Sequence, residues 1–383
     1  MAAETSQHCL SLRAKLYRLK RTLFPFYDRR FLFIIMSAFS ERVMNLTRTS
    51  LMVGFATSMS WEVGIFQALA ESSTPLTSLQ VAQAKRLKER YVRELLGALV
   101  TAELVEVSVG DDGVLLYSLD DVAKKDLQGP TGAIMCYPAV VTTLYKPVKE
   151  CIFADGPNGV RFNDEVQKFY DGMMETNAPK LVSNFVESVP NLKSRLEQGI
   201  DVIEMGGGAA RLSATFASQF PNSRFVASEV SAKLVESNRA RWAHVTNLSF
   251  SVDDLCAIPE TPEKVYDLVF CNDVIHDLPD PLAALCGIRR LLKKPDGLFM
   301  FQDITTSGSP VEDKGNMLVS FYYAASTFLC IPESYQREKS DALGPCWGRN
   351  MALQLAKQAE FEVRDVPIDP VHAMYICTLP TDD

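Results

Sequence analysis

Long hydrophobic runs are missing from this sequence of 383 residues. A membrane-spanning helix needs roughly 18 consecutive apolar residues, and the longest candidate, residues 31–39, is too short. A surplus of positive charge is missing too, since 47 acidic residues against 39 Lys and Arg give a net charge of −8. Nucleic-acid binding depends on Lys and Arg that displace counterions from phosphates. We therefore expect no integral-membrane segment, no nucleic-acid partner and a small-molecule ligand.

Paired cysteines are also missing. The nine cysteines include no Cys-x-x-Cys pair and are odd in number, so neither a disulfide framework nor a zinc knuckle fits. Most have apolar neighbours, as Cys271 does after Val269 and Phe270, which is typical of buried thiols in a reducing compartment. We predict a cytoplasmic protein with no metal site.

Acidic residues are nearly absent from residues 1–30, where Arg and Lys are interleaved with apolar residues. A basic amphipathic leader is typical of an organelle-targeting peptide or of a helix at a membrane surface. A solvated extension is the alternative, and the weak Ser enrichment favours it over a transit peptide. Residues 1–30 are therefore predicted to form a basic N-terminal extension, with organelle targeting left open.

Residues 31–129 have the element order of a winged helix. Helical spacing of apolar residues extends to about position 70, and the turn at 74–77 provides an N-cap for a short helix through Val81 and Ala82. A longer helix follows over 88–104, and then two strands joined by an acidic turn that contains glycine. We predict a winged-helix domain that serves dimerisation.

DNA binding is the other interpretation of this module. Lys88, Arg90 and Arg93 lie on the longer helix, where a DNA-binding winged helix would contact phosphates. Acidic residues in the same helix and in the turn at 111–112 offset these charges. A dimerisation or scaffold role is therefore favoured.

Residues 130–198 are predicted to be a helical linker that also forms part of the substrate pocket. Helix breaks are expected at Pro138, Pro147, Pro179 and Pro190 and in the loop at 155–159. The segment 169–174 is rich in aromatic residues and Met, which suits either core packing or the wall of a substrate pocket.

From residue 199 to the end at 383, strands alternate with helices. This alternation predicts an α/β domain with a mostly parallel sheet that is covered on both faces. The expected strands are 202–205, 225–228, 248–252, 268–271, 298–302, 361–364 and 374–378.

The first of these strands runs into a glycine-rich loop, Gly206-Gly207-Gly208, before a helix that begins near Arg211. Glycines let a backbone approach a ligand closely. The second strand ends at Glu229, whose carboxylate can accept hydrogen bonds from both hydroxyls of a ribose. A carboxylate at the end of the third strand, Asp253 or Asp254, can accept from an adenine amine. Since Arg211 stands where a dinucleotide fingerprint needs a third glycine, these features favour another nucleoside ligand.

Polar residues follow the fourth strand, at Asn272 and then at His276 and Asp277. Ligands of open α/β sheets lie at the carboxyl ends of strands, so these residues should face the reactive end of the cofactor. His276 is suited to act as a base, with Asp277 orienting its ring. A structural histidine in the turn is an equally good interpretation.

At these residues the chain resembles the class I S-adenosylmethionine-dependent methyltransferases, and more narrowly two-domain members with an N-terminal winged helix, which occur in bacteria and nematodes. The resemblance extends from about residue 31 to the C-terminus and includes residues 88–94, the glycine loop, 275–281, 292–297, 326–332 and 343–348. Two departures from the usual pattern are the triple glycine and Glu360, where many relatives have Gly.

The resemblance implies a Rossmann-like sheet of seven strands, S-adenosylmethionine as cofactor and a homodimer formed through the N-terminal helices. Similarity to plant O-methyltransferases suggests His276 as the base. The predicted cofactor-binding residues are Glu204, Gly206, Gly207, Gly208, Glu229, Asp253, Asp254 and Asn272, and the predicted catalytic residues are His276 and Asp277. The predicted substrate pocket contains Tyr170, Met174, Phe321, Tyr322 and Trp347.

The sequence thus predicts a small-molecule methyltransferase whose acceptor atom is oxygen, nitrogen or sulfur. One alternative is a non-catalytic, cofactor-sensing or DNA-binding regulator on the same fold. A nicotinamide oxidoreductase is another, which the missing third glycine disfavours.

Overall fold

The computed structural model describes residues 38–337 and 339–380, and its packing divides the chain after Met52. The part that ends at Met52 contains helix α2 (Ala38–Met44), the π-helical turn η1 (Asn45–Ser50) and the first residues of α3 (Leu51–Glu62). The predicted basic extension, residues 1–30, lies outside the described residues. In the described part of the chain, no helix is both long and apolar enough to cross a bilayer.

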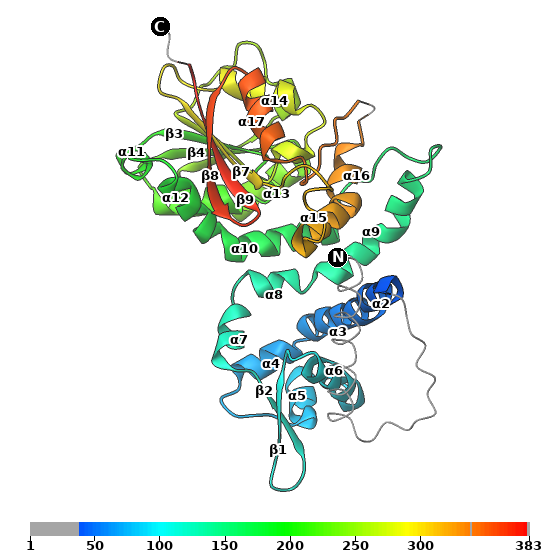
Figure 1. The fold of residues 1–383 in the computed structure, drawn as a ribbon. Coiled ribbons are helices and arrows are strands. Elements are labelled where there is room, and N and C mark those ends of the chain that lie inside the picture. Colours follow the sequence, from blue (N-terminus) through cyan, green and yellow to red (C-terminus); the bar gives the residue numbers. More distant parts are fainter. Residues whose placement is uncertain (1–37, 338, 381–383) are drawn as a thin grey trace, which may run out of the picture. The chain divides into compact units, whose positions relative to one another are not determined.

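The predicted winged helix is present in the second part (Figure 1). Thr77 caps α5 as expected, because its hydroxyl accepts from the Gln80 amide at 3.1 Å while the Gln80 side chain accepts from the Thr77 amide at 2.7 Å. Two antiparallel strands form the wing. The elements are α4 (Ile65–Glu71), α5 (Ser78–Lys85), α6 (Glu89–Thr101), β1 (Glu106–Val109) and β2 (Leu115–Ser118).

Helices follow the wing, but two of the expected breaks are wrong. Pro147 lies inside α9 and Pro179 inside α10. A proline costs a helix one backbone hydrogen bond, and in α10 the burial of the neighbouring Ala178, Leu181 and Phe185 offsets that loss. The helices are α7 (Asp121–Asp126), α8 (Pro130–Ile134), α9 (Tyr137–Cys151), α10 (Asp164–Glu187) and α11 (Leu192–Gln198).

A seven-stranded sheet forms the C-terminal domain, which confirms the predicted Rossmann-like fold. The strand order is β5-β4-β3-β6-β7-β9-β8, with β9 antiparallel to both neighbours and the other pairs parallel. The direction of strand addition reverses between β3 and β6, which is where open sheets bind ligands. The strands are β3 (Asp201–Met205), β4 (Arg224–Glu229), β5 (Leu248–Val252), β6 (Leu268–Asn272), β7 (Leu298–Ile304), β8 (Glu362–Asp369) and β9 (His372–Thr378).

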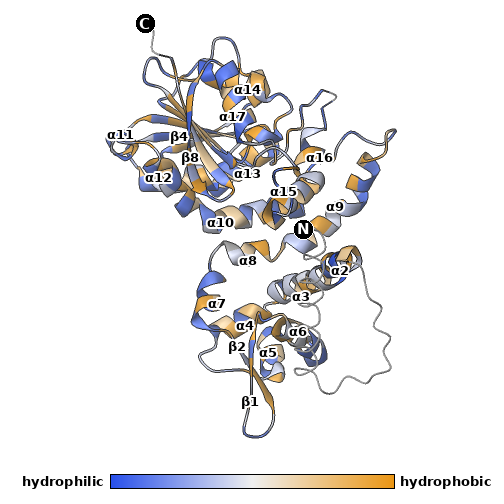
Figure 2. Cartoon of the chain, viewed as in Figure 1, coloured by the Kyte–Doolittle hydropathy of each residue, from blue (hydrophilic) through white to orange (hydrophobic). Residues whose placement is uncertain are grey.

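Apolar layers cover both faces of this sheet, and Figure 2 shows the hydrophobic residues along its central strands. One face packs against α14 (Pro281–Arg290) and α17 (Arg349–Gln358). The other packs against α10, α11 and α12 (Arg211–Gln219). The remaining elements are α13 (Ala232–Arg241), η2 (Leu255–Ala257), η3 (Ile275–Asp277), α15 (Met317–Phe328) and α16 (Cys330–Ser334).

Candidate active site

The glycine loop leaves β3 in a conformation that ordinary residues avoid. Gly206 has φ +76°, and a Cβ there would lie 2.8 Å from both methyl carbons of Val274. The amides of Gly206 and Gly207 both donate to the Ser228 carbonyl at 2.9 Å, which binds the loop to the end of β4. A Cβ on Gly208 would meet no atom within 4 Å. The loop therefore presents open space beside its third glycine.

Glu204, at the end of β3, is buried beneath this loop. One carboxylate oxygen accepts from the amide and the hydroxyl of Ser213 at 3.0 and 2.5 Å. Burial raises the pKa of Glu204 to about 7, against the effect of the Ser213 hydrogen bonds. These contacts attach helix α12 to the end of β3, directly before the loop. The Glu204 carboxylate therefore helps to fix the position of the loop.

Glu229 lies against the glycine loop, as the predicted ribose site requires. Its carboxylate accepts from the Gly208 amide at 3.2 Å and from the Ser231 amide at 3.0 Å. The Asn238 side chain donates to the Gly208 carbonyl at 2.7 Å and so fixes the loop from the other side. The end of β4 and the loop after β3 are thereby joined into one surface.

The two aspartates after β5 have different partners. Asp253 accepts from the hydroxyls of Ser228 and Ser251 at 2.7 and 2.5 Å. Asp254 accepts from the Cys256 amide at 3.0 Å and from the Arg337 guanidinium at 2.5 Å. The adenine-accepting role remains a prediction for both residues.

Arg211 has a packing role at the position where a dinucleotide-binding loop would have glycine. Its guanidinium pairs with Asp171 and Glu175 of α10, and Arg241 also pairs with Asp171 at 2.9 Å. Trp242 donates its indole N–H to the Ala209 carbonyl at 2.9 Å. These contacts hold α10 against the start of α12.

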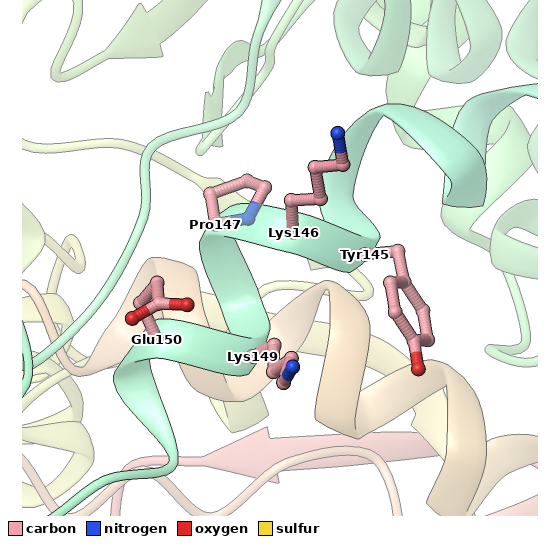
Figure 3. Close-up of a pocket in the computed structure, with 5 residues that line it drawn as sticks. All are labelled: Tyr145, Lys146, Pro147, Lys149 and Glu150. Carbon is pink, nitrogen blue, oxygen red and sulfur yellow. The ribbon is translucent and has the colours of Figure 1, made fainter.

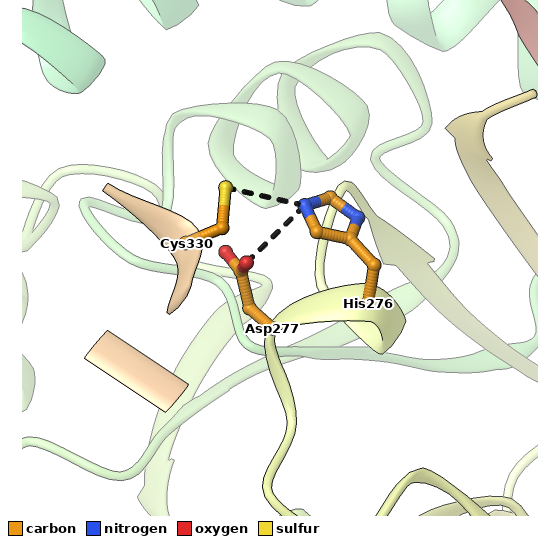
Figure 4. Close-up of side chains that lie close together, drawn as sticks. All are labelled: His276, Asp277 and Cys330. Carbon is orange, nitrogen blue, oxygen red and sulfur yellow. Dashed lines mark hydrogen bonds and ion pairs between the residues drawn. The ribbon is translucent and has the colours of Figure 1, made fainter. Parts of the chain in front are cut away.

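His276 is buried at the end of the β6 loop, with 3% of its side chain exposed. Its Nδ1 lies 2.6 Å from the carboxylate of Asp303, at the end of β7. Its Nε2 lies 3.3 Å from Asp277 and 3.8 Å from the Cys330 thiol (Figure 4). Asp303, which was not predicted, therefore orients the ring through Nδ1, and the orienting role predicted for Asp277 stays a prediction.

The charges around His276 decide its proton affinity. Burial alone would lower the pKa of His276, but the carboxylates of Asp303 and Asp277 outweigh it and raise the pKa well above its usual value. Burial also raises the pKa of Cys330 to about 12, with Asp277 adding to the effect. The imidazole is thus a strong proton acceptor beside a neutral thiol.

Several buried polar atoms near this edge of the sheet have no hydrogen-bond partner among the described residues. Buried polar groups normally find partners, so unsatisfied ones mark a place where a ligand or water completes the structure. Asp273 is buried with φ +52°, and burial raises its pKa to about 6. The atoms are Asn272 Oδ1, Asp273 Oδ1, Asp303 Oδ2, Tyr137 Oη and Trp347 Nε1.

Three of the predicted pocket residues, Tyr170, Tyr322 and Phe321, interact with residues of the candidate site. Tyr170 extends its hydroxyl into a buried region, where burial and then the charges of Cys330 and Asp277 raise its pKa. The pKa of Tyr322 is raised to about 12 by burial and by Asp273. Phe321 packs against Tyr137, with ring centroids 5.2 Å apart.

Two other predicted pocket residues are placed differently. Met174 is half-buried against the apolar layer under the sheet, so its packing is that of a core residue. Trp347 is buried, and its indole N–H has no partner in the part of the chain that the structure describes. Its segment is anchored by the Gly344 amide, which donates to the His276 carbonyl at 3.0 Å.

Asp303, Cys330 and Tyr137 were missed by the sequence predictions. Asp303 could have been predicted, because it lies near the carboxyl end of β7, the strand next to β6. The rule that ligands lie at the carboxyl ends of strands had already been applied to β3, β4 and β5. Nothing in the sequence indicates Cys330 or Tyr137, which only helix packing brings to the site.

A hollow elsewhere, on helix α9, does not form part of this site (Figure 3). It is lined by residues of one helix, Tyr145, Lys146, Pro147, Lys149 and Glu150. Because the described residues that line it all belong to one helix, this hollow lacks the enclosure of a binding pocket.

Comparison with known proteins agrees with this architecture. Residues 196–338 match a family described as Methyltransferase domain, and residues 51–120 match one described as Rv2258c-like winged HTH domain. The chain therefore carries a methyltransferase domain that follows a winged-helix domain in the sequence. This result confirms the two-domain S-adenosylmethionine-dependent methyltransferase resemblance seen in the sequence.

Sequence relatives match the methyltransferase domain over short segments. The trans-aconitate 2-methyltransferase of Methylobacterium radiotolerans is 33% identical over 100 residues, which is 26% of this chain and 36% of that protein. The malonyl-[acyl-carrier protein] O-methyltransferase 1 of Ilyobacter polytropus is 26% identical over 120 residues, which is 30% of this chain and 44% of that protein. The chain thus spans less than half the length of these curated relatives.

A solved structure matches nearly the whole chain, including the winged-helix region. Human N-acetylserotonin methyltransferase, crystallised in complex with SAM, superposes with a TM-score of 0.66 over 91% of this chain and 100% of that chain, at 17% identity. At this identity the similarity establishes the fold.

Proposed function

We propose that this chain is an S-adenosylmethionine-dependent methyltransferase that acts on an oxygen, nitrogen or sulfur atom of a small molecule. The observation that carries the proposal is the joining of the loop after β3 to the end of β4, through Glu229 and the Gly208 amide. The open space at Gly208 and the unsatisfied oxygens of Asn272 and Asp273 fit a nucleoside cofactor with a polar tail. The methyltransferase-domain match and the neighbour bound to SAM support the same cofactor.

S-adenosylmethionine supplies a methyl group on a positively charged sulfur, so the protein must align an acceptor lone pair and remove its proton where it has one. We assign the removal of this proton to His276. Asp303 accepts the Nδ1 proton, which leaves the Nε2 lone pair free, and it stabilises the imidazolium that forms afterwards. The base role and the pocket residues are part of the proposal.

An enzyme is favoured over a DNA-binding regulator by the ion pairs of α6. Arg90 pairs with Glu94 at 2.5 Å, and Arg93 pairs with Glu89 at 2.5 Å. Two of the cations that would contact phosphate are thus neutralised within their own helix.

We also propose a homodimer formed through the N-terminal helices. In the part of the chain up to Met52, Phe39, Leu46, Leu51 and Met52 are between 45% and 77% exposed. Apolar residues gathered at this density mark an interaction surface.

A binding and turnover experiment tests the proposed function. S-adenosylmethionine and its homocysteine product should raise the melting temperature, whereas NAD should not. Methyl release should then appear with at least one member of a panel of phenols, thiols, hydroxy acids and amines. Stabilisation without any turnover would favour the cofactor-sensing regulator, and stabilisation by NAD alone would contradict the proposal.

A further inference from the structure

His276, Asp277 and Cys330 meet in a small group whose potential ligand atoms all lie within 4.8 Å of one another. His276 and Asp277 come from the turn η3, and Cys330 from the first position of α16 (Figure 4). Histidine nitrogen, carboxylate oxygen and thiolate sulfur are the three ligand types that proteins offer to zinc. We propose that these three side chains bind one divalent ion of the zinc class.

The separations between these atoms agree with a tetrahedral zinc centre. Bond lengths of about 2.05 Å to nitrogen, 2.1 Å to oxygen and 2.3 Å to sulfur place nitrogen about 3.4 Å from oxygen and about 3.6 Å from sulfur. The observed distances from Nε2 are 3.3 Å to Asp277 Oδ1 and 3.8 Å to Cys330 Sγ. Little rearrangement is therefore needed around Nε2, and the Asp277 carboxylate oxygen and Cys330 Sγ lie within 4.8 Å of each other.

A second observation is the state of the Asp277 oxygen. Asp277 Oδ1 is buried and has no hydrogen-bond partner in the described structure, although it lies 3.3 Å from a ring nitrogen. The two atoms are close, yet their geometry is not that of a hydrogen bond. A cation between them satisfies both at once.

The outer surroundings also suit a metal-bound histidine. Metal-ligating histidines usually donate their other ring N–H to a carboxylate, which fixes the ring and the tautomer. Asp303 lies 2.6 Å from Nδ1 of His276 and is fully buried. The thiolate of Cys330 and the carboxylate of Asp277 balance the two charges of the ion, and the thiol proton is released to solvent on binding together with the Nε2 proton of any protonated imidazole.

Three protein ligands leave a fourth tetrahedral position open. An ion on Nε2 also occupies the lone pair that His276 needs as a base. On the basis of the proposed function, zinc should therefore inhibit methyl transfer reversibly. The sequence predicts no metal site because its cysteines form no Cys-x-x-Cys pair, and the proposal rests on the fold that brings residues 276, 277 and 330 together.

Cobalt provides a test that does not depend on enzyme activity. The full-length chain, stripped with a chelator, is titrated with Co²⁺ while absorbance is recorded. We expect one Co²⁺ per chain, visible bands of tetrahedral cobalt, a near-ultraviolet thiolate band and displacement by one equivalent of Zn²⁺. Cys330→Ser should lose the thiolate band, and Asp277→Asn should weaken binding by tenfold or more.

Cys346→Ser is the matched control, because Cys346 is a similarly buried thiol outside the group. It should keep the full cobalt spectrum, and melting curves should show that every variant is folded. Absence of cobalt binding by the parent chain, or an unchanged thiolate band in Cys330→Ser, would overturn the proposal. A chain that binds cobalt but transfers no methyl group once the metal has been removed with a chelator would contradict the proposed function and leave the metal site standing.

Discussion

Charged residues are arranged in opposite ways on helix α6 and around His276. On α6, Arg90 and Arg93 each pair with a glutamate one turn away, and the arginine side chains are 65% and 58% exposed. The side chains of His276 and Asp303 are almost fully buried, and several oxygens around them lack partners among the described residues. Exposed ion pairs of this kind contribute little to the stability of the fold and can be replaced by other residues. Buried polar groups without partners lower the stability unless a ligand supplies their hydrogen bonds. The comparison locates the chemistry in the sheet domain.

The largest expected effect comes from the centre of the buried group. His276→Ala should lower methyl transfer by roughly 100-fold or more, because the acceptor proton loses its base. Cofactor affinity should hardly change, since the predicted ribose and adenine contacts lie on other strands. Turnover and cofactor binding are measured separately on the same preparation. Full activity in this variant would show that His276 has a structural role. The buried group would then differ from α6 in burial but not in catalysis.

The pH dependence of turnover tests the link between Asp303 and His276. His276 accepts a proton only when deprotonated, and its pKa is raised, so kcat/KM should increase with pH through a value above the usual 6.5. Asp303→Asn removes a negative charge and should lower the pKa of His276, which moves the acidic limb of the profile to lower pH. Activity should also fall by about tenfold or more, because the ring is less well oriented.

Asp365→Asn is the control for the pH profile, since Asp365 forms a surface pair with Arg349 at 2.6 Å. Its profile should match that of the parent chain. An acidic limb that stays in place in Asp303→Asn would show that another group controls the reaction.

A smaller effect is expected where the glycine loop meets β4. Glu229→Ala should weaken S-adenosylmethionine binding by roughly 1 to 3 kcal/mol, through the lost ribose hydrogen bonds. Calorimetric titration measures the change. Glu236→Ala serves as control, because Glu236 lies at the surface of α13, where it pairs with Arg239 at 3.3 Å. Equal affinities for both variants would remove the ribose assignment.

The smallest effect is expected on α6 itself. Arg93→Ala should change the melting temperature little and leave turnover unaltered, because the pair with Glu89 is at the surface. The parent chain should also show no salt-sensitive affinity for duplex DNA. If the parent chain bound duplex DNA tightly and in a salt-sensitive way, and Arg93→Ala abolished this binding, α6 would be the functional surface. That result would support the DNA-binding regulator.

Strand patterns in the sequence predicted the fold closely. All seven strands were expected near their observed positions, and the winged-helix order was predicted together with the Thr77 cap. These features depend on local periodicity and on capping chemistry, which are read from neighbouring residues. The prolines in α9 and α10 were misjudged because tertiary burial outweighs a local preference.

The amino-acid sequence by itself determined which residues stand at and just after the ends of β3, β4, β5 and β6, since the strand pattern alone places Glu229 at the end of β4 and His276 in the turn after β6. Only the tertiary structure decided what surrounds them. Asp303 meets His276 because β7 lies beside β6, and Cys330 does so because α16 packs over the turn that carries the histidine. Contacts between distant segments depend on how elements pack, and no pattern within one segment records them.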